Sequence, residues 1–299
     1  MRHLKVYDMI EAVDRAGSIR KAAEDMNITA SALNRRIQAF EEEFGSEIFE
    51  RLSRGMRLNP AGELLLHHIR AQRTDFARVK SQVADLSGVR RGHVSIACSQ
   101  ALIPYFLPKQ IATYRRDHPG VTFSVNVRDR VQAEQDLVNF ESDLALVFEP
   151  AHMVDFEVLF AIKQPVYAVM SRAHPLAGRD ELRLRACMEY DLVLPGTQYG
   201  VRGLLDRAAK RMGRKLEPAL ETESFEMIRH YAAYGQTIGF QIPIGLNPSK
   251  HPEIACIRIS EKDVPGGELL LGQLRGRALP VASIKFARQV ASALEKMEA

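Results

Sequence analysis

The chain has 299 residues, of which 46% are hydrophobic and 26% are charged, and its formal net charge at pH 7 is +4. This composition excludes a chain that is disordered throughout, and the length suits two or three folded units better than one. The small positive excess permits nucleic-acid binding without indicating it, so the distribution of charge is more informative than the total.

The cysteines and the N-terminus bear on the compartment in which the chain works. Cys98, Cys187 and Cys256 lie far apart, and none belongs to a C-x-x-C pair. A disulfide framework, a structural zinc site and cysteine-based redox sensing are therefore not expected. The N-terminus has no apolar signal core, and no run approaches the roughly 18 apolar residues that span a bilayer. We expect a cytoplasmic protein with no membrane partner and no bound metal or cofactor.

Helices with short breaks are predicted over the first ninety residues. The first is indicated by apolar residues at helical spacing, namely Leu4, Tyr7, Ile10 and Val13. Gly17 ends it, Ser18 is expected to cap the second helix, and Thr29 is expected to cap the third. The third helix carries one buried face, formed by Leu33, Ile37, Phe40 and Phe44.

A fourth, longer helix follows a short basic turn between two extended arms over residues 50–58. Asn59 suits its N-cap and Pro60 its first position. Its seam alternates by four and three residues through Leu65, Ile69, Gln72, Phe76, Val79, Val83 and Leu86. This heptad spacing favours a dimerisation helix, in which Gln72 fixes the register at some cost in stability. Packing of the same seam against the chain's own domains is the alternative.

Beyond a polar, glycine-bearing linker at residues 87–92, short β-branched runs alternate with helical segments. Strands are predicted over 94–98, 121–127 and 144–148, with helices over 104–116 and 131–139 between them. A second set comprises strands at 166–170, 192–194 and 238–241, helices near 201–212 and 225–234, and a closing strand and helix at 268–271 and 282–296. This rhythm predicts parallel sheets covered by helices, in a hinged sensor of two lobes.

The segment over residues 19–44 has the properties of a helix-turn-helix. Ala22 and Ala23 let the two short helices approach closely, and Leu33 anchors their crossing. The second helix then presents side chains that hydrogen-bond base edges to a major groove. The predicted DNA contacts are Thr29, Ala30, Ser31, Asn34, Arg35, Arg36 and Gln38 on this helix, and Arg51, Arg54 and Arg57 on the basic turn as a wing. A solvated surface helix is the alternative, and the acidic run at residues 41–43 is not typical of a uniformly basic surface.

Blocks spread over nearly the whole chain carry a family resemblance. They are SIRKAAEDMNI (18–28), NRRIQAFEEEFG (34–45), IFER (48–51), LNPAG (58–62), GHVSI (92–96), LP (107–108), HPGV (118–121), SDLAL (142–146) and GQTIGFQIP (235–243). In order and spacing they resemble the LysR-type transcriptional regulators. That family usually has Gln-Pro in place of Ala30-Ser31, Ser in place of Asn34, and often Thr-Glu in place of Asn59-Pro60. Because the first two differences fall on base-facing positions, the family's sequence preference is not carried over.

The pattern and the resemblance together predict an α+β multidomain fold. A winged helix-turn-helix DNA-binding domain occupies residues 1–60, a linker and dimerisation helix 61–88, and an effector-binding domain 89–299. The last is a two-lobed α/β sensor that resembles the periplasmic binding proteins, with lobe I at about 92–161 and 267–299 and lobe II at about 162–266. The resemblance further implies a homodimer through the linker helix, a homotetramer on bent promoter or operator DNA, and RNA polymerase as a candidate partner.

The effector is expected in the crevice between the lobes, at the carboxyl ends of the strands. The predicted contacts are Ser99, Gln100, Arg128, Thr197, Gln198, Tyr199, Arg202, Phe225 and Ile242. Helix-start N–H groups, hydroxyls and guanidinium groups favour a small anionic metabolite. Each residue also has a purely structural interpretation: Ser99 and Thr197 as helix caps, the two arginines in surface pairs, and Phe225 and Ile242 as core residues.

The sequence thus predicts a transcription regulator that binds double-stranded DNA and responds to a small-molecule effector. Nine histidines invite a catalytic interpretation, but H-E-x-x-H, G-x-S-x-G, G-x-x-x-x-G-K-[ST] and G-x-G-x-x-G are all missing, and no enzyme activity is expected. A transport protein that binds solutes also has two α/β lobes, but it needs an export signal and no helix-turn-helix. Salt-sensitive DNA binding separates the regulator from both alternatives.

Overall fold

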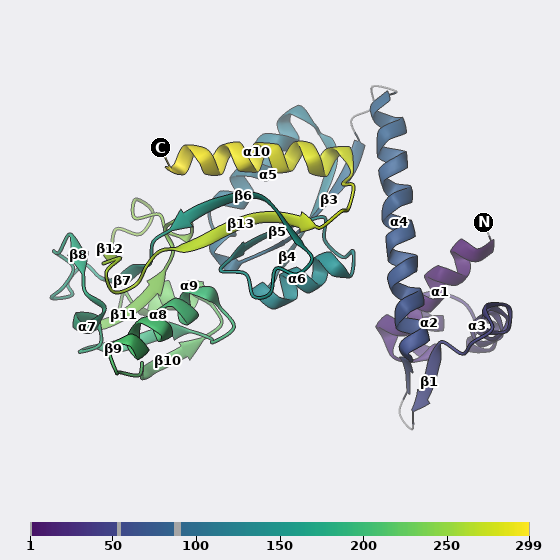
Figure 1. Cartoon of the computed structure of the whole chain (residues 1–299), viewed down its shortest axis with the longest axis horizontal. Coiled ribbons are helices and arrows are strands. Elements are labelled where there is room, and N and C mark those ends of the chain that lie inside the picture. Colours follow the sequence, from purple (N-terminus) through teal and green to yellow (C-terminus); the bar gives the residue numbers. More distant parts are fainter. Residues whose placement is uncertain (1, 53–54, 87–90, 299) are drawn as a thin grey trace. The chain divides into compact units, whose positions relative to one another are not determined.

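The computed structural model describes residues 2–52, 55–86 and 91–298 (Figure 1). The chain divides into two compact units, residues 1–77 and 78–299, and each has its own hydrophobic core. In the described ranges, no helix combines the length and the apolar content that a membrane crossing requires.

The first unit is built from helices and a two-stranded antiparallel ribbon. Its elements are α1 (Arg2–Ala16), α2 (Ile19–Asp25), α3 (Ala30–Phe44), β1 (Phe49–Leu52), β2 (Gly55–Leu58) and the start of α4 (Pro60–Leu86). Gly17, with φ +63°, ends α1, and the Thr29 hydroxyl caps α3 by accepting the Ala32 N–H at 3.2 Å. Ser18 occupies the N-cap of α2, but its side chain makes no capping bond, so the predicted cap is wrong in that respect.

The buried faces of the three short helices pack into one core. These helices contribute Ile10 and Val13 of α1, Ala22 of α2, and Leu33 and Ile37 of α3, all at most 2% exposed. The sequence predicts Phe44 on the same face, but this side chain is 46% exposed. It is the last residue of α3, one turn beyond the core, and it stacks on Phe40 with ring centroids 5.7 Å apart. The buried face of α3 therefore ends at Phe40.

The heptad seam of α4 divides into two parts. The helix begins at the predicted residue, where the Asn59 side chain accepts the Gly62 N–H at 2.8 Å. Leu65 and Ile69 are buried in the core of the first unit. Further along, Phe76, Val79 and Val83 are 54%, 45% and 56% exposed, and the side chain of Leu86 lies outside the described residues. Packing within the first unit thus accounts for the first part of the seam and not for the second.

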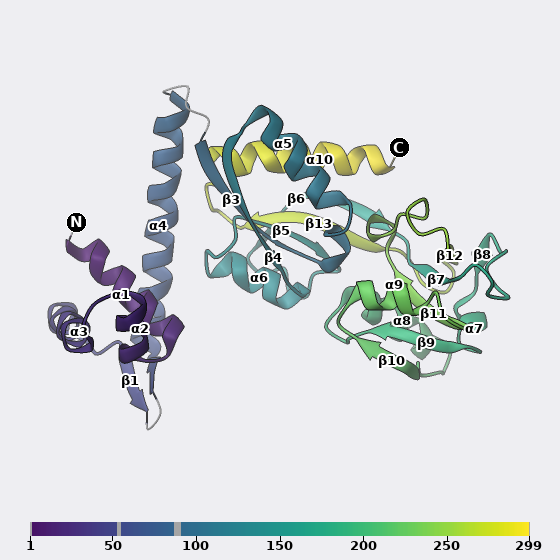
Figure 2. The same cartoon turned by 180° about the vertical axis from the view of Figure 1, so that it is seen from behind.

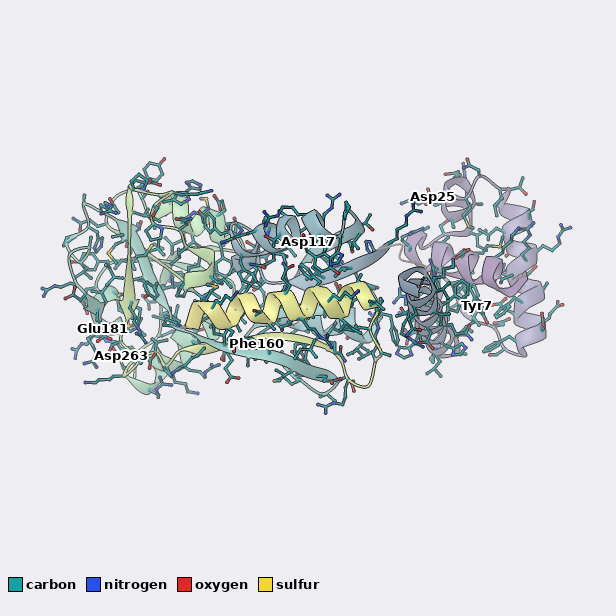
Figure 3. The ribbon with its side chains drawn as sticks, turned by 90° about the horizontal axis from the view of Figure 1, so that it is seen from above. Tyr7, Asp25, Asp117, Phe160, Glu181 and Asp263 are labelled. Carbon is teal, nitrogen blue, oxygen red and sulfur yellow. The ribbon has the colours of Figure 1, made fainter. Side chains whose placement is uncertain are left out.

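The second unit contains two sheets. The sheet of lobe I has the order β4-β3-β5-β13-β6. Its strands are β3 (Arg91–Cys98), β4 (Gly120–Val127), β5 (Leu144–Phe148), β6 (Phe156–Gln164) and β13 (Gly267–Leu274); the first three are parallel, and β13 is antiparallel to its neighbours. Helices α5 (Phe106–Asp117) and α10 (Val281–Glu298) cover one face and α6 (Arg130–Val138) the other (Figure 2). Figure 3 shows Phe160 of β6 beside α10, where it packs on the core.

The sheet of lobe II has the order β10-β9-β11-β7-β12-β8. Its strands are β7 (Tyr167–Ser171), β8 (Glu181–Leu182), β9 (Asp191–Pro195), β10 (Pro218–Thr222), β11 (Thr237–Gln241) and β12 (Ile254–Ile259). Its helices are α7 (Leu184–Cys187), α8 (Gly200–Arg211) and α9 (Phe225–Tyr231), and η2 (Pro243–Gly245) is a 3-10 turn. An ion pair between Arg183 and Asp263 fixes the start of α7, near the labelled Glu181 and Asp263 of Figure 3.

The chain passes from lobe I to lobe II after β6 and returns immediately before β13. Gly267 of β13 pairs with Gln164 of β6, so the outgoing and returning segments lie side by side. Lobe II is therefore one continuous insertion between two strands of lobe I.

The strand β6 is the largest element that the sequence does not predict. In the β6–β13 ladder Leu271 pairs with Phe160, but the next residue, Gly272, pairs with Val158, so Leu159 is bulged out. A bulge breaks the two-residue periodicity that identifies a strand from its sequence. The short strands β8, β10 and β12 are also missing from the prediction.

A buried ion pair ties the segment between β13 and α10 to the start of β5. The Arg277 guanidinium and the Asp143 carboxylate are both buried, with Nη2 and Oδ1 2.5 Å apart. The Ser283 hydroxyl donates to the other carboxylate oxygen at 2.8 Å. Both ions lose their water shell here, so this network stabilises lobe I only while it stays complete.

Candidate nucleic-acid interface and small-molecule crevice

The polar edge of α3 lies on the surface of the first unit. Its predicted residues Thr29, Ala30, Ser31, Arg35, Arg36 and Gln38 are exposed, and Asn34 is half-buried. The opposite face of the same helix is the buried one. An amphipathic helix with such an edge has the shape that a major groove admits. The exposure of this edge is compatible both with groove binding and with the alternative of a solvated surface helix.

Small residues set the crossing of α2 and α3. Ala22 and Ala23 are buried at the crossing, and the turn runs through Asn27, which adopts a left-handed φ of +54°. The Ile28 N–H then donates to the Ala23 carbonyl at 3.0 Å, which closes the turn. This is the tight connection that a helix-turn-helix needs to hold its second helix away from the body of the domain.

The wing is held against the turn between α1 and α2. The Met56 N–H donates to the Gly17 carbonyl at 2.9 Å, and a Cβ at position 55 would stand 2.4 Å from that oxygen, so only glycine fits. Arg51 and Arg57 are exposed on the two strands, but Arg57 pairs with Glu50 at 3.1 Å. Arg54 lies outside the described residues. Arg57 must therefore exchange a carboxylate for a phosphate if it contacts DNA.

A crevice lies between the lobes at the carboxyl ends of β3, β4 and β5. Five of the predicted contacts line it: Ser99, Arg128, Tyr199, Phe225 and Ile242. The sequence prediction misses its other lining residues, which are Ala101, Asp129, Arg130, Val147, Phe148, Gly200 and Val201. The cavity itself measures about 10 Å³, which is space for about one water molecule.

The arginines of the crevice differ in how their charge is balanced. Arg128 Nε pairs with the buried Asp136 carboxylate at 2.9 Å. Arg130 donates from Nη1 to the Glu149 carbonyl at 3.2 Å, and its buried Nε has no partner. Arg229 and Arg277 also have a buried Nε without a partner, but each forms an ion pair with a carboxylate. No described carboxylate pairs with Arg130. Arg130 is thus the cation of this crevice that an anion would neutralise.

Tyr199 and Phe225 form an aromatic wall on the lobe II side. Their ring centroids are 5.2 Å apart and the rings are inclined at 65°. Burial, followed by the nearby carboxylates of Glu223 and Asp129, raises the pKa of the Tyr199 hydroxyl. The hydroxyl is therefore protonated at neutral pH and is a hydrogen-bond donor.

Four predicted contacts do not line the crevice. Thr197 is exposed, and Gln198 donates to the Glu223 carboxylate at 2.8 Å within lobe II. Gln100 donates to the Glu223 carbonyl at 2.7 Å and accepts the Phe225 N–H at 3.1 Å. The Arg202 side chain is buried and donates to the carboxylates of Asp206 and Glu221 and to the Pro195 carbonyl. The charge of Arg202 is consequently balanced within lobe II.

The remaining candidate chemistry is sparse. The described residues contain no group of three or more His, Cys, Asp or Glu side chains that could hold a metal ion. Burial raises the pKa of the Cys98 and Cys187 thiols to about 12 and that of Cys256 to about 11. Thiols with such pKa values are weak nucleophiles at neutral pH.

A winged helix-turn-helix joined to a two-lobed α/β domain with an inter-lobe crevice defines a class of protein, the ligand-responsive DNA-binding regulators. Two family models match the same two parts of the chain. Residues 4–63 match the model described as bacterial regulatory helix-turn-helix protein, lysR family, and residues 87–295 match the LysR substrate binding domain. The chain belongs to the LysR family of transcription regulators and carries that family's effector-binding domain.

Individual relatives support the same assignment. The chain is 26% identical to the RuBisCO operon transcriptional regulator of Allochromatium vinosum, over 99% of this chain and 97% of that protein. It is 32% identical to the transcriptional regulator CbbR of Sinorhizobium medicae, over 80% and 77% of the two chains. Full-length CbnR, solved with its target DNA, has a similar fold, with a TM-score of 0.67 at 18% identity over 97% and 99% of the chains. The predicted family and fold class are therefore confirmed.

Proposed function

We propose that this regulator responds to a small carboxylate that carries an apolar body. The observation that carries this proposal is Arg130, a cation in the crevice that has no carboxylate partner among the described residues and keeps a buried Nε–H without an acceptor there. A buried N–H that has lost its water costs free energy until an acceptor replaces the water. A carboxylate on Arg130 supplies that acceptor and the opposite charge.

The walls of the crevice support the apolar body. Val147 and Phe148 of lobe I line the crevice together with the aromatic pair of Tyr199 and Phe225 and with Ile242 of lobe II. The Tyr199 hydroxyl and Ser99 provide polar groups near the arginines. Ser99, Arg128, Arg130, Tyr199, Phe225 and Ile242 are the residues that we assign to the effector. Gln198 and Arg202 keep the partners described above, and Gln100 and Thr197 are not assigned to it.

Thermal unfolding of the full-length chain with matched small molecules tests this proposal. Benzoate has both features, acetate has the charge without the body, and benzamide has the body without the charge. We expect the melting temperature to rise with benzoate by more than with either of the other two, because a ligand stabilises the state that it binds. Equal shifts for benzoate and benzamide would contradict the role given to Arg130.

For the DNA-binding part we propose that α3 reads base edges and the wing contacts the backbone. The assigned residues are Thr29, Ala30, Ser31, Asn34, Arg35, Arg36 and Gln38, with Arg51, Arg54 and Arg57. We further propose that two chains form a homodimer through α4, because the second part of this helix exposes three apolar seam positions. The proposed domains are the DNA-binding domain at residues 1–60, the linker helix at 61–88 and the effector-binding domain at 89–299. Two such dimers form a tetramer on one operator, and sedimentation of the purified chain with and without DNA distinguishes the dimer from the tetramer.

This function places the chain in the cytoplasm with its DNA, with RNA polymerase as a further partner and with no catalytic activity of its own. The family and the relatives named above support a regulator rather than an enzyme. A pull-down of RNA polymerase on promoter DNA, with and without this protein, tests the polymerase contact.

A further inference from the structure

The side chain of Gln100 joins the two lobes at one end of the crevice. Gln100 begins the 3-10 turn η1 (Gln100–Leu102), which follows β3 in lobe I. Its Nε2 donates to the Glu223 carbonyl at 2.7 Å and to the Tyr199 hydroxyl at 3.3 Å, and its Oε1 accepts the Phe225 N–H at 3.1 Å. All three partners belong to lobe II. The amide of Gln100 therefore makes its hydrogen bonds across the lobe boundary.

These bonds satisfy backbone groups that would otherwise need water. The Gln100 amide pairs with the carbonyl of residue 223 and the N–H of residue 225, as a neighbouring strand would. Phe225 is the first residue of α9, and the N–H groups of a first helical turn have no acceptor within their own helix. Gln100 supplies that acceptor from the other lobe, so separation of the lobes leaves the Phe225 N–H unpaired.

The crevice is too small to admit a ligand while the Gln100 bonds hold the lobes together. A cavity of about 10 Å³ does not admit a carboxylate with an apolar body, because ligand sites of that kind measure hundreds of Å³. Entry therefore requires the lobes to separate. Other contacts cross the same boundary, among them Arg207 with Glu149 at 3.0 Å and the Tyr105 hydroxyl with His251 at 2.8 Å. Gln100 makes three of the crossing bonds, and two of them engage backbone groups.

We propose that Gln100 is a clasp: its three hydrogen bonds to lobe II hold the crevice closed, and they must break before the effector can enter. The Phe225 N–H, once released, becomes a donor for the incoming carboxylate. The Tyr199 hydroxyl loses the Gln100 N–H that it accepts and keeps its own O–H as a second donor. Gln100 then opposes effector binding, although its position in the sequence suggests a contact that favours it. The clasp itself does not depend on the effector class, but its competition with the effector rests on the function proposed above.

Labelling of a thiol in the crevice measures opening directly. Val147 is buried, lines the crevice, lies on β5 and makes none of the clasp bonds, so Val147→Cys places a thiol of similar size there. In this background we compare Gln100→Ala with Gln198→Ala, which removes the same side chain from a bond confined to lobe II. Mass spectrometry of the full-length chain reports the site of labelling, and the native Cys98, buried in β3, reports whether lobe I stays folded.

We expect Gln100→Ala to accelerate labelling at position 147 by at least about tenfold, because two or three net hydrogen bonds are lost from the closed state. Gln198→Ala is expected to leave the rate unchanged, and Cys98 is expected to remain unlabelled in both. A rate for Gln100→Ala within twofold of the parent overturns the clasp. Equal acceleration by Gln198→Ala overturns it as well, because any change near Glu223 would then suffice.

The benzoate concentration that gives half of the maximal thermal shift supplies a second measurement. If the clasp competes with the ligand, Gln100→Ala lowers this concentration, since a larger fraction of the protein is open to binding. A higher concentration means that Gln100 contacts the carboxylate and overturns the competition. Faster labelling without any benzoate shift, in the parent or in the variant, supports the clasp and contradicts the carboxylate effector, so the two proposals fail separately.

Discussion

On α3 the polar side chains stand exposed along one edge of the helix, whereas in the crevice between the lobes most polar groups are already bonded to the protein. No described carboxylate lies within ion-pair distance of Arg35 or Arg36, but Arg128 and Arg202 are both paired. The polar edge of α3 therefore needs no ion pair to break before it meets phosphates and bases, whereas Arg57 on the wing must first leave Glu50. The effector surface needs bonds to break, because its contacts compete with the bonds that close the lobes.

The two surfaces therefore serve different ends: the DNA surface sets the affinity for DNA, and the crevice sets the conformational response to the effector. A surface that is ready for its partner binds with little rearrangement, so each side chain contributes directly to affinity and salt dependence. A crevice that must open converts part of the ligand's binding free energy into a change between two conformations. Substitutions at the two surfaces should consequently differ in what they change, and the expected effects below run from the largest to the smallest.

Some arginines of this chain stabilise the fold, whereas others are available to a ligand. Arg277 is buried with Asp143 at 2.5 Å, so Asp143→Ala leaves an uncompensated buried charge. We expect the free energy of unfolding to fall by about 3–5 kcal/mol, measured by urea titration. The control is Glu189→Ala, which removes an exposed pair with Arg214 and should cost well under about 1 kcal/mol. A small loss for Asp143→Ala would remove the basis for this distinction.

Arg130 tests the effector side of the comparison. Arg130→Gln keeps a polar side chain but removes the charge that a carboxylate requires. We expect the benzoate concentration at half-maximal thermal shift to rise about 10- to 100-fold, which corresponds to one charged hydrogen bond of about 1.5–3 kcal/mol. DNA affinity without benzoate should be unchanged. The matched control is Arg214→Gln on the surface of lobe II, and an equal effect there would mean that net charge alone is responsible.

Asn34 tests base reading on α3. It is half-buried on the polar edge, and its amide has the geometry that pairs with adenine. With a DNA fragment selected from a random library by the full-length chain, we expect Asn34→Ala to reduce discrimination against random DNA by about 1–3 kcal/mol. Binding to random DNA should hardly change. Unaltered discrimination in competition gel shifts would move base reading to other residues.

Arg35 tests the backbone contacts and is expected to have the smallest effect. Arg35→Ala should weaken binding to selected and random DNA alike, by about 1 kcal/mol, and should reduce the salt dependence by about one phosphate contact. Fluorescence anisotropy at several salt concentrations measures both quantities, with Arg214→Ala as the control. A loss confined to the selected sequence would assign Arg35 to base reading instead.

The sequence predicts most of the fold because apolar periodicity is a local property. The buried face of α3, the capping residues Thr29 and Asn59, and the strand Leu144–Phe148 all follow from neighbouring residues. The strand β6 does not, because the bulge at Leu159 breaks its alternation. Phe44 has the right spacing but lies beyond the end of the core, and the length of a core is not encoded in the spacing of one helix.

The crevice is predictable in position but not in detail. Strand ends locate Ser99 and Arg128, since parallel strands end at one edge of a sheet. Arg202 and Arg130 are chemically the same, and each stands near the start of a helix. Their roles diverge because Asp206 and Glu221 reach Arg202, while no described carboxylate reaches Arg130. The pair with Asp206 is local, at i, i+4 on α8, but the pair with Glu221 is a property of the folded chain, in which residues of different elements meet.

The insertion of lobe II between β6 and β13 has an evolutionary consequence. Because Gln164 and Gly267 are paired neighbours, the two ends of the inserted lobe II lie next to each other. A short hairpin turn is enough to join β6 to β13 if lobe II is removed, and a different inserted segment can use the same two junctions. Half of each sensing crevice can thereby be exchanged in one step of recombination, while the DNA-reading part of the gene is inherited intact.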